Sequence, residues 1–501
     1  MERWGSRLGA LLALVGGAVG LGNFLRFPFQ AAKWGGGAFL VPYGVALLWV
    51  GLPLVWMEVA MGRAGSKAAA QSAPRLLEVL IGRWGWFVGL VAVYVSIGVA
   101  AYYAYLTGWT VGYAWHGLRG DFPAGAVEQG ASFHSRFLAG EAVLWWIGVL
   151  VLMGLVLSAG LQKGLEKVSL YGMPLLFLLA GGIAIGVFFV GETGRCASCS
   201  VWAGLRYLYL PRWEALLQPA VWLAATGQVF FTIGVGFGIY LVYSAAWSGN
   251  DPIRDSVLTV SANTFAEVGL GGVIVIPLVA AFLGMEAVQA RAGFGMGFEV
   301  MPYVLMAWGG RLLVVAWYLL LFLAAFTSLI AMGWVGVTWL SEAVGGTPRR
   351  WAWPLTLAIA VLGAPVAFGP NSSAMDLYDQ WMGSLFLVVA ALGQWWVFQR
   401  VRPWAVVEAE SRWRLGRVWR FIMQVGTPVF LIFLLVGSFF QPEKGDWVGA
   451  CRQLLAGEGW PWAPEALPVS LAHHLRDPWG LAGFLLLILT AGGLVLLRKR
   501  S

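Results

Sequence analysis

Long apolar segments recur along the whole chain and are separated by short polar loops. A transmembrane helix needs about 20 predominantly apolar residues. Segments of this kind occupy residues 8–32, 38–62, 86–115, 142–160, 168–191, 219–246, 258–284, 311–341, 352–369, 379–399, 419–440 and 478–497. The pattern predicts an all-α protein with twelve transmembrane helices. Because this number is even, both termini lie on the same side of the membrane.

The amino-acid composition indicates a membrane protein rather than a soluble one. Hydrophobic residues make up 59% of the chain and charged residues 11%, whereas soluble domains carry about 25% charged residues. A soluble core could not hide this much apolar surface, so soluble enzymes and nucleic-acid-binding proteins are excluded and the lipid bilayer is the partner. We expect one transmembrane domain over residues 1–501, with spans 1–10 (about 8–399) as its core and spans 11 and 12 (about 419–497) after it.

The distribution of basic residues predicts the orientation. The formal net charge is +8, and with a cytoplasmic N-terminus the inner loops carry 20 Lys and Arg residues against 10 in the outer loops. Cytoplasmic loops of membrane proteins are enriched in Lys and Arg. The preference for Arg over Lys is typical of a bacterium with a GC-rich genome. We therefore expect a bacterial cytoplasmic membrane with both termini cytoplasmic.

The cysteines leave two alternatives open. Cys196 and Cys199 form a CxxC pair in the loop after span 5, which is compatible with a disulfide or with two free thiols. A zinc site would need two more ligands, and the four histidines show no metal-binding spacing.

Several polar side chains fall inside the apolar spans, where they are costly unless they bind something. Asn23 and Asn263 lie deep in spans 1 and 7. The others are Arg26, Glu58, Gln228, Thr232, Glu267, Thr327, Ser328, Asp376 and Asp379. Singly, each could join two helices through a hydrogen bond. Together they predict a buried polar site.

Spans 1 and 6 carry glycines in their middle, at 16–22 and 234–238. For either span alone, close helix packing through small residues explains them. However, spans 1 and 6 are the first members of two five-span halves, where inverted-repeat transporters place their broken helices. A broken helix frees carbonyls for a cation and offers a half-helix N-terminus to an anionic group.

Segments 20–28 (GLGNFLRFP) and 35–43 (GGGAFLVPY) resemble the signature of the neurotransmitter:sodium symporter family, and most of all its bacterial amino-acid transporters. The resemblance extends over all twelve spans and weakens in the loops and in spans 11 and 12. Further matching residues are Met57-Glu58, Tyr102-Tyr103, 227–232 (GQVFFT), 267–272 (EVGLGG), Thr327-Ser328 and Asp379.

The resemblance implies a five-plus-five inverted repeat with broken helices 1 and 6, two sodium sites and an amino-acid site at the midplane. The first sodium site would comprise Ala18, Asn23, Thr232, Asn263 and the substrate carboxylate; the second would comprise Gly16, Val19, Ala324, Thr327 and Ser328. Hard oxygen ligands suit an alkali cation. The substrate residues would be Ala18, Leu21, Gly22, Val99, Tyr103, Phe231, Thr232, Gly234, Phe237, Ser328 and Met332.

The resemblance also implies gates and an anion substitute. Arg26 and Asp379 would pair through water to close the outer side, above an aromatic lid of Tyr103 and Phe237. Arg3 and Glu342 would close the inner side. Glu267 stands where chloride-dependent members have a serine, so no chloride requirement is expected, and a proton would bind this acid during the empty return step. Glu58 would support the unwound backbone, and the spacing of Gly164 and Pro174 resembles an element proposed to unwind span 5.

These features predict a sodium-coupled symporter of hydrophobic or aromatic amino acids that works by alternating access and is not an enzyme. Gly20 replaces the aspartate of monoamine carriers, which favours a substrate with its own carboxylate. A channel, an intramembrane enzyme and a sensor are the alternatives. A channel would need a continuous polar pore, and no nucleophile motif supports an enzyme. The sequence is compatible with a homodimer but does not determine the oligomeric state.

Overall fold

The computed structural model describes residues 2–191, 196, 199–247, 251–290, 295–369, 373–440, 447–456, 460–463 and 466–497. The α-helices are α1 (Arg7–Ala18), α2 (Phe27–Lys33), α3 (Leu40–Ala46), α4 (Leu52–Ser66), α5 (Ala73–Ile81), α6 (Arg83–Arg119), α7 (Gly130–Gly140), α8 (Ala142–Gly160), α9 (Lys167–Val187), α10 (Val201–Tyr209), α11 (Pro219–Ile233), α12 (Ile239–Ala245), α13 (Pro252–Thr264), α14 (Gly272–Leu283), α15 (Met285–Ala290), α16 (Met301–Val344), α17 (Ala352–Phe368), α18 (Ser373–Tyr378), α19 (Leu387–Val401), α20 (Trp404–Glu410), α21 (Arg417–Phe421), α22 (Thr427–Phe440), α23 (Trp447–Leu455), α24 (Leu467–His474) and α25 (Pro478–Leu497).

Short π-helical segments join several of these helices within one span: Gly22–Arg26, Leu47–Gly51, Leu161–Glu166, Phe265–Gly271, Met296–Val300, Asp379–Phe386 and Ile422–Gly426. Three 3₁₀ turns, Val127–Gln129, Trp213–Leu217 and Pro348–Trp351, lie in loops or at helix ends. The described residues form no strand. The predicted all-α class is confirmed.

The apolar helices are consistent with the twelve predicted spans. Among the described residues, nine helices are long and apolar enough to cross a membrane, or ten if the bent pair Arg7–Ala18 and Gly22–Lys33 is one span. Residues 142–187 count as one helix in this total although Gly160 has a φ of 83°, which separates α8 from α9. The span at 219–245 is divided into α11 and α12. Each of these two helices is too short to be counted as a membrane-spanning helix.

Span 1 is broken, as the sequence predicts. Helix α1 ends at Ala18, Val19 has extended backbone angles, and the helix resumes after a bend of 46°. The glycines here serve close packing rather than unusual backbone angles. A Cβ atom at Gly16 would lie 3.0 Å from the Thr327 Cβ atom, and one at Gly20 would lie 2.7 Å from the Tyr103 hydroxyl.

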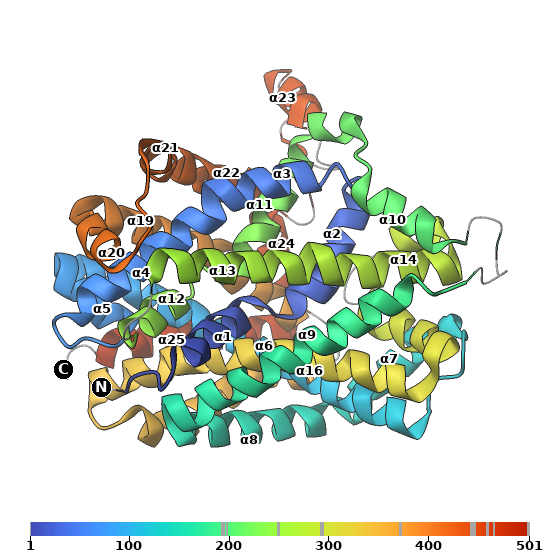
Figure 1. Ribbon diagram of the computed structural model, residues 1–501, viewed down its shortest axis with the longest axis horizontal. Coiled ribbons are helices and arrows are strands. Elements are labelled where there is room, and N and C mark those ends of the chain that lie inside the picture. Colours follow the sequence, from blue (N-terminus) through green and yellow to red (C-terminus); the bar gives the residue numbers. More distant parts are fainter. Residues whose placement is uncertain are drawn as a thin grey trace.

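Span 6 is also broken, and here the glycines provide the backbone conformation. Gly234, Gly236 and Gly238 have φ values of 75°, 88° and 77°, a region that side chains with a Cβ atom rarely adopt. The Gly236 N–H donates to the Glu58 carboxylate at 2.6 Å, so Glu58 supports the unwound backbone of span 6. The two interrupted spans pass each other in the middle of the molecule (Figure 1).

Span 5 is interrupted next to Gly164, one of the two residues whose spacing resembles an unwinding element. Pro174 lies inside the continuous helix α9, whereas the break falls at Gly160 and the π-helical segment that follows it. Gly164 lies in this segment, where a Cβ atom would collide with the Val156 carbonyl oxygen, so no side chain fits there.

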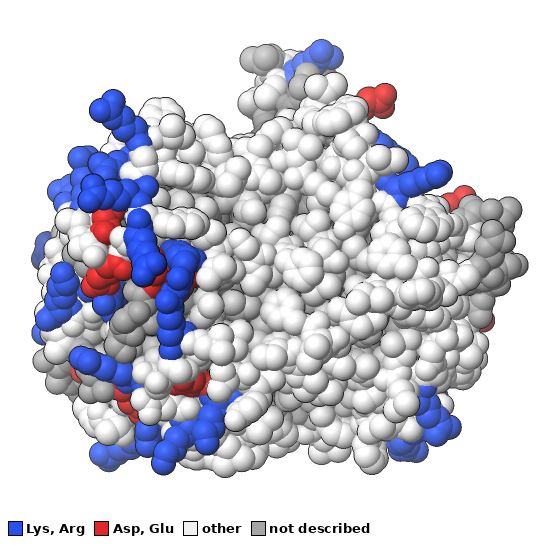
Figure 2. All heavy atoms as spheres, in the orientation of Figure 1, with Lys and Arg blue, Asp and Glu red and all other residues white. Residues whose placement is uncertain are grey.

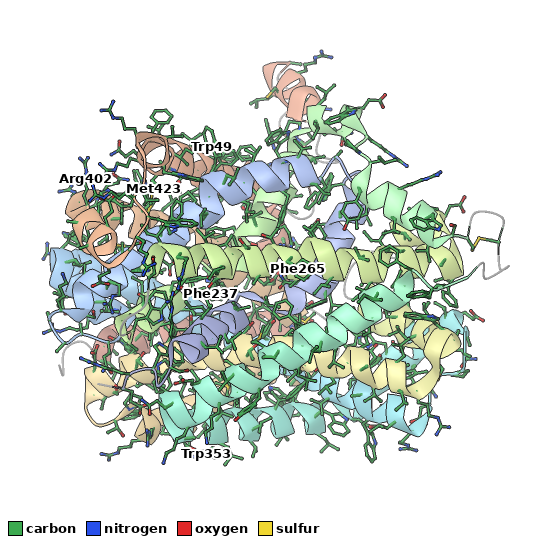
Figure 3. The ribbon with its side chains drawn as sticks, viewed as in Figure 1. Trp49, Phe237, Phe265, Trp353, Arg402 and Met423 are labelled. Carbon is green, nitrogen blue, oxygen red and sulfur yellow. A yellow bond between two sulfur atoms is a disulfide. The ribbon has the colours of Figure 1, made fainter. Side chains whose placement is uncertain are left out.

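The two ends of the described chain lie at the same end of the molecule, which we call the terminal face (Figure 1). Lys and Arg side chains gather at the terminal face, and a broad uncharged band crosses the middle of the molecule (Figure 2). Cys196 and Cys199 form a disulfide at the opposite end (Figure 3), which resolves the alternatives that the sequence leaves open.

Candidate functional site

A central cavity lies between the two broken spans and the long helices α6 and α16. It encloses about 410 Å³ of space free of protein atoms. Its lining comprises Gly17, Ala18, Gly20, Gly22, Asn23, Val99, Tyr103, Phe231, Thr232, Gly234, Phe237, Ile239, Ser328 and Met332. Phe237, on the unwound part of span 6, is near the centre of the molecule (Figure 3). Ten of the eleven predicted substrate residues therefore meet at one cavity.

Leu21, the eleventh predicted substrate residue, does not line this cavity. Its backbone N–H donates to the Tyr103 hydroxyl at 2.9 Å. This bond links the break in span 1 to helix α6. Leu21 lines the outer cavity described below.

The two intramembrane asparagines contact each other beside the central cavity. Both are fully buried, and the Asn23 side-chain amide donates to the Asn263 side-chain oxygen at 2.8 Å. The Asn23 oxygen accepts the Gly20 N–H at 2.8 Å. The Thr232 hydroxyl is buried without a hydrogen-bond partner. A buried polar atom without a partner is costly, so a ligand for these oxygens would relieve that cost.

The predicted oxygens of the second cation site also converge. The Ser328 hydroxyl lies 3.1 Å from the Gly16 carbonyl oxygen, 3.4 Å from that of Val19 and 3.2 Å from that of Ala324. The Thr327 hydroxyl lies 3.2 Å from the Ala324 carbonyl oxygen. The break in span 1 is what exposes the Gly16 and Val19 carbonyls to helix α16. Oxygen ligands alone, without sulfur or imidazole, fit an alkali cation.

Glu267 is fully buried next to the asparagine pair. It accepts a hydrogen bond from the Tyr43 hydroxyl at 2.6 Å and another from the Gln228 side-chain amide. Glu267 and Asn263 are four residues apart, one turn of the same span. The carboxylate is thus held by neutral donors, one turn from the predicted first sodium site.

An outer cavity of about 820 Å³ lies on the side away from the terminal face and holds both predicted outer-gate residues. The Arg26 guanidinium lies 4.5 Å from the centre of the Phe231 ring, and the Asp379 carboxylate accepts the Tyr102 hydroxyl at 2.8 Å. Arg26 and Asp379 face the same space without forming a direct ion pair, an arrangement that leaves room for water between them.

The predicted inner pair of Arg3 and Glu342 is not formed. Glu342 instead accepts hydrogen bonds from the Gln71 and Ser72 backbone and from the Ser72 hydroxyl. Arg3 offers its carbonyl oxygen to the Gln162 side chain at 2.8 Å.

Other contacts hold the N-terminal segment against the terminal face. The Trp4 indole donates to the Tyr243 carbonyl oxygen at 3.0 Å, and the Gly5 N–H donates to Glu166 at 2.6 Å. Arg7 forms an ion pair with Asp255 at 2.8 Å, where the Asp255 side chain is fully buried. The N-terminal segment is therefore held by an ion pair of Arg7, four residues after Arg3.

Ile239 lines the cavity although the sequence does not single it out. A Cβ atom at Gly17 would lie 3.3 Å from the Ile239 Cγ2 atom, so this side chain fills part of the space that Gly17 leaves. The only sequence signal is its place directly after the glycines of span 6.

Comparisons with known proteins agree with this geometry. The model of the sodium:neurotransmitter symporter family matches residues 1–133 and 139–467. An uncharacterized sodium-dependent transporter of Methanocaldococcus jannaschii is 28% identical, over 86% of this chain and 89% of its own length. The sodium-dependent serotonin transporter of Drosophila melanogaster is 27% identical, over 87% of this chain and 76% of its own length. The solved structure of MhsT in complex with L-phenylalanine matches with a TM-score of 0.77 and 25% identity, over 88% of this chain and all of that one.

The fold and these matches define a multi-pass, sodium-dependent membrane transporter of a small molecule. The chain belongs to the sodium:neurotransmitter symporter family. The family, the membrane-spanning all-α class and the transporter rather than enzyme function are confirmed.

Proposed function

We propose that this protein couples the entry of hydrophobic or aromatic amino acids to sodium by alternating access, in a bacterial cytoplasmic membrane with both termini inside. The observation that carries the proposal is the central cavity, which has apolar walls and an oxygen cluster on each side of the break in span 1. The gathering of basic residues at the terminal face supports its cytoplasmic orientation.

The proposed coupling follows from the arrangement of charge. One sodium ion would bind Ala18, Asn23, Thr232 and Asn263, and a substrate carboxylate next to Tyr103 would complete its shell. A second ion would bind between span 1 and α16 at the Ser328 cluster. Because the carboxylate itself is a sodium ligand, each would raise the affinity for the other.

An amino acid is favoured over a monoamine. The tight contacts at Gly20 leave no space for an acidic side chain that could replace a substrate carboxylate. The remaining cavity wall, formed by Val99, Phe231, Phe237 and Met332, is apolar. The solved MhsT structure is a complex with L-phenylalanine, which agrees with a hydrophobic or aromatic substrate here.

Thermal stability of the purified protein tests the proposal. Phenylalanine, leucine and tryptophan should raise the melting temperature in sodium but not in potassium, because binding to the folded state stabilises it. A monoamine that stabilises the protein when no amino acid does so would contradict the proposed substrate class. Counterflow of labelled amino acid in proteoliposomes separates a carrier from a channel or an enzyme, because only a carrier exchanges the unaltered substrate.

Ile239→Ala should shift the preference towards larger side chains. Removal of three carbon atoms beside Gly17 opens the apolar end of the cavity, and each methylene group in such a pocket is worth about tenfold in selectivity or more. We expect tryptophan to compete better against labelled phenylalanine and leucine to compete worse. Ile488→Ala, a change at a side chain that is 48% exposed on α25, is the control. An unchanged order of competition would show that Ile239 does not limit substrate size.

Glu267→Ser should make transport depend on chloride. We propose that wild-type uptake is independent of chloride because the Glu267 carboxylate supplies the negative charge beside the first sodium, and that a proton binds this acid during the empty return step. The serine variant removes that charge and leaves Tyr43 and Gln228 as donors to an anion. Uptake measured with chloride or gluconate as the external anion checks this result. A variant that is equally active in both would exclude the role of Glu267 as an anion substitute.

A further inference from the structure

A polar pocket opens at the terminal face, away from the central cavity. It lies between α5, α6 and α16, encloses about 1090 Å³ of space free of protein atoms and is lined by Ser72, Arg75, Glu78, Trp86, Trp339 and Glu342 among others. We call it the terminal pocket. None of the proposed sodium or amino-acid ligands lines it.

The terminal pocket carries more negative than positive side chains. Arg75 and Glu78 form an ion pair at 2.7 Å. The three hydrogen bonds to Glu342 come from neutral donors, and no ion pair of the described residues includes this carboxylate. The pocket therefore presents two carboxylates and one guanidinium, with the charge of Glu342 unneutralised. A carboxylate has about four acceptor positions, so Glu342 can accept one more donor.

Trp339 connects this pocket to an apolar groove. Trp339 lines both the terminal pocket and an open groove between α16, α17 and α25, which has about 1490 Å³ of space free of protein atoms. The groove faces outward in the uncharged part of the molecule, since Leu357 and Leu489 in its wall are 67% and 69% exposed. Trp339 itself is only 2% exposed, and its indole N–H is buried without a hydrogen-bond partner.

An exposed tryptophan next to the terminal pocket indicates that this pocket lies at the depth of lipid headgroups. Trp84, two residues before the pocket residue Trp86, is 57% exposed and lies 5.2 Å from the Arg83 guanidinium. Exposed tryptophan beside a basic residue is typical of the boundary between membrane and water. A molecule that fills both spaces thus has its polar part at this boundary and its apolar part in the hydrocarbon layer.

We propose that the terminal pocket and the adjoining groove bind one phospholipid with a primary ammonium headgroup, of the phosphatidylethanolamine type. The ammonium group lies between Glu342 and Glu78, the phosphate lies near Arg75, and an acyl chain occupies the groove past Trp339. An ammonium group donates hydrogen bonds to carboxylates. The trimethylammonium group of phosphatidylcholine has no N–H donor, and the phosphatidylglycerol headgroup carries no positive charge to balance Glu342.

Native mass spectrometry of the full-length protein in detergent tests the proposal. The purified protein is incubated with equal amounts of palmitoyl-oleoyl phosphatidylethanolamine, phosphatidylcholine and phosphatidylglycerol, and the bound lipids are counted. We expect one phosphatidylethanolamine per chain, preferred about tenfold over the other two, because a hydrogen bond to a charged group is worth about that ratio. Glu342→Gln should remove the preference, since glutamine keeps an acceptor for Ser72 but loses the charge.

Two neighbouring glycines provide a matched pair for the groove. A Cβ atom at Gly492 or Gly493 would meet no atom within 4 Å, so a side chain can begin at either position without a clash. Only Gly493 lines the groove. Gly493→Leu should reduce the bound phosphatidylethanolamine about tenfold by filling the groove, and Gly492→Leu should not. Glu214→Gln, at an exposed site remote from the pocket, controls for the loss of one charge.

Three outcomes would overturn the proposal. The first is equal binding of phosphatidylethanolamine by the wild type, Glu342→Gln and Gly493→Leu. The second is loss with Glu342→Gln but not with Gly493→Leu, together with competition by free phosphoethanolamine, because the pocket then takes a soluble zwitterion. The third is a dimer that excludes lipid from the groove and that Gly493→Leu dissociates, because the groove then belongs to a second copy of this chain.

Discussion

Gly20→Ala should weaken amino-acid binding about 100-fold or more. A Cβ atom at this position would lie 2.7 Å from the Tyr103 hydroxyl and 3.1 Å from the Ser328 hydroxyl. Tyr103 is the proposed partner of the substrate carboxylate, and Ser328 belongs to the proposed second sodium site. Forcing an extra carbon into a well-packed interior costs about 1–3 kcal/mol. Here that cost is added to the displacement of both partners, so we expect affinity to fall about 100-fold or more.

Binding of labelled phenylalanine to the purified variant in sodium measures this effect. Gly181→Ala is the matched control, because a Cβ atom at Gly181 meets no atom within 4 Å. Gel filtration establishes that both variants remain folded. Wild-type affinity in a folded Gly20→Ala variant would place the substrate carboxylate somewhere other than beside Tyr103.

Ser328→Ala should weaken the activation of substrate binding by sodium. The Ser328 hydroxyl is the group that reaches carbonyl oxygens on both α1 and α16. Loss of one oxygen ligand to a cation is comparable with loss of a hydrogen bond to a charged group, so the sodium concentration for half-maximal binding should rise about tenfold.

A sodium titration of labelled phenylalanine binding checks this expectation. Ser341→Ala is the control on the same helix, because its hydroxyl bonds only to the Thr338 carbonyl oxygen of α16 and it is as buried as Ser328, at 8% exposure. An equal rise of the half-maximal sodium concentration in both variants, or no rise in Ser328→Ala, would contradict a second sodium site at Ser328.

The break in span 6 has a local cause, whereas the glycines of span 1 serve close packing. Gly234, Gly236 and Gly238 adopt backbone angles that few other residues tolerate. The sequence predicts this break from the glycines together with the corresponding positions of spans 1 and 6 in the two five-span halves. The clustering of the polar residues was also predictable, because an asparagine or glutamate inside an apolar span is costly unless it has a polar partner. Asn23 contacts Asn263 as that reasoning requires.

The inner contacts and part of the cavity wall were not predictable, because they depend on distances between helices. Arg3 and Arg7 look alike in sequence, and only the packing of α1 beside α13 selects Arg7 as the partner of Asp255. The sequence does not distinguish Ile239 from other apolar residues of the core. Its role in the cavity wall depends on the small size of Gly17, which lies next to it. In span 5, the break falls at Gly160, which has a φ of 83°, and the sequence does not single this glycine out.

Uptake of labelled phenylalanine into proteoliposomes tests sodium-coupled amino-acid transport most directly. At zero membrane potential, an inward sodium gradient should raise the internal concentration above the external one for as long as the gradient lasts, with the label recovered as intact phenylalanine. An inward potassium gradient should give no accumulation. Equal uptake under both gradients, or none above equilibrium with sodium for any hydrophobic or aromatic amino acid, would contradict the account.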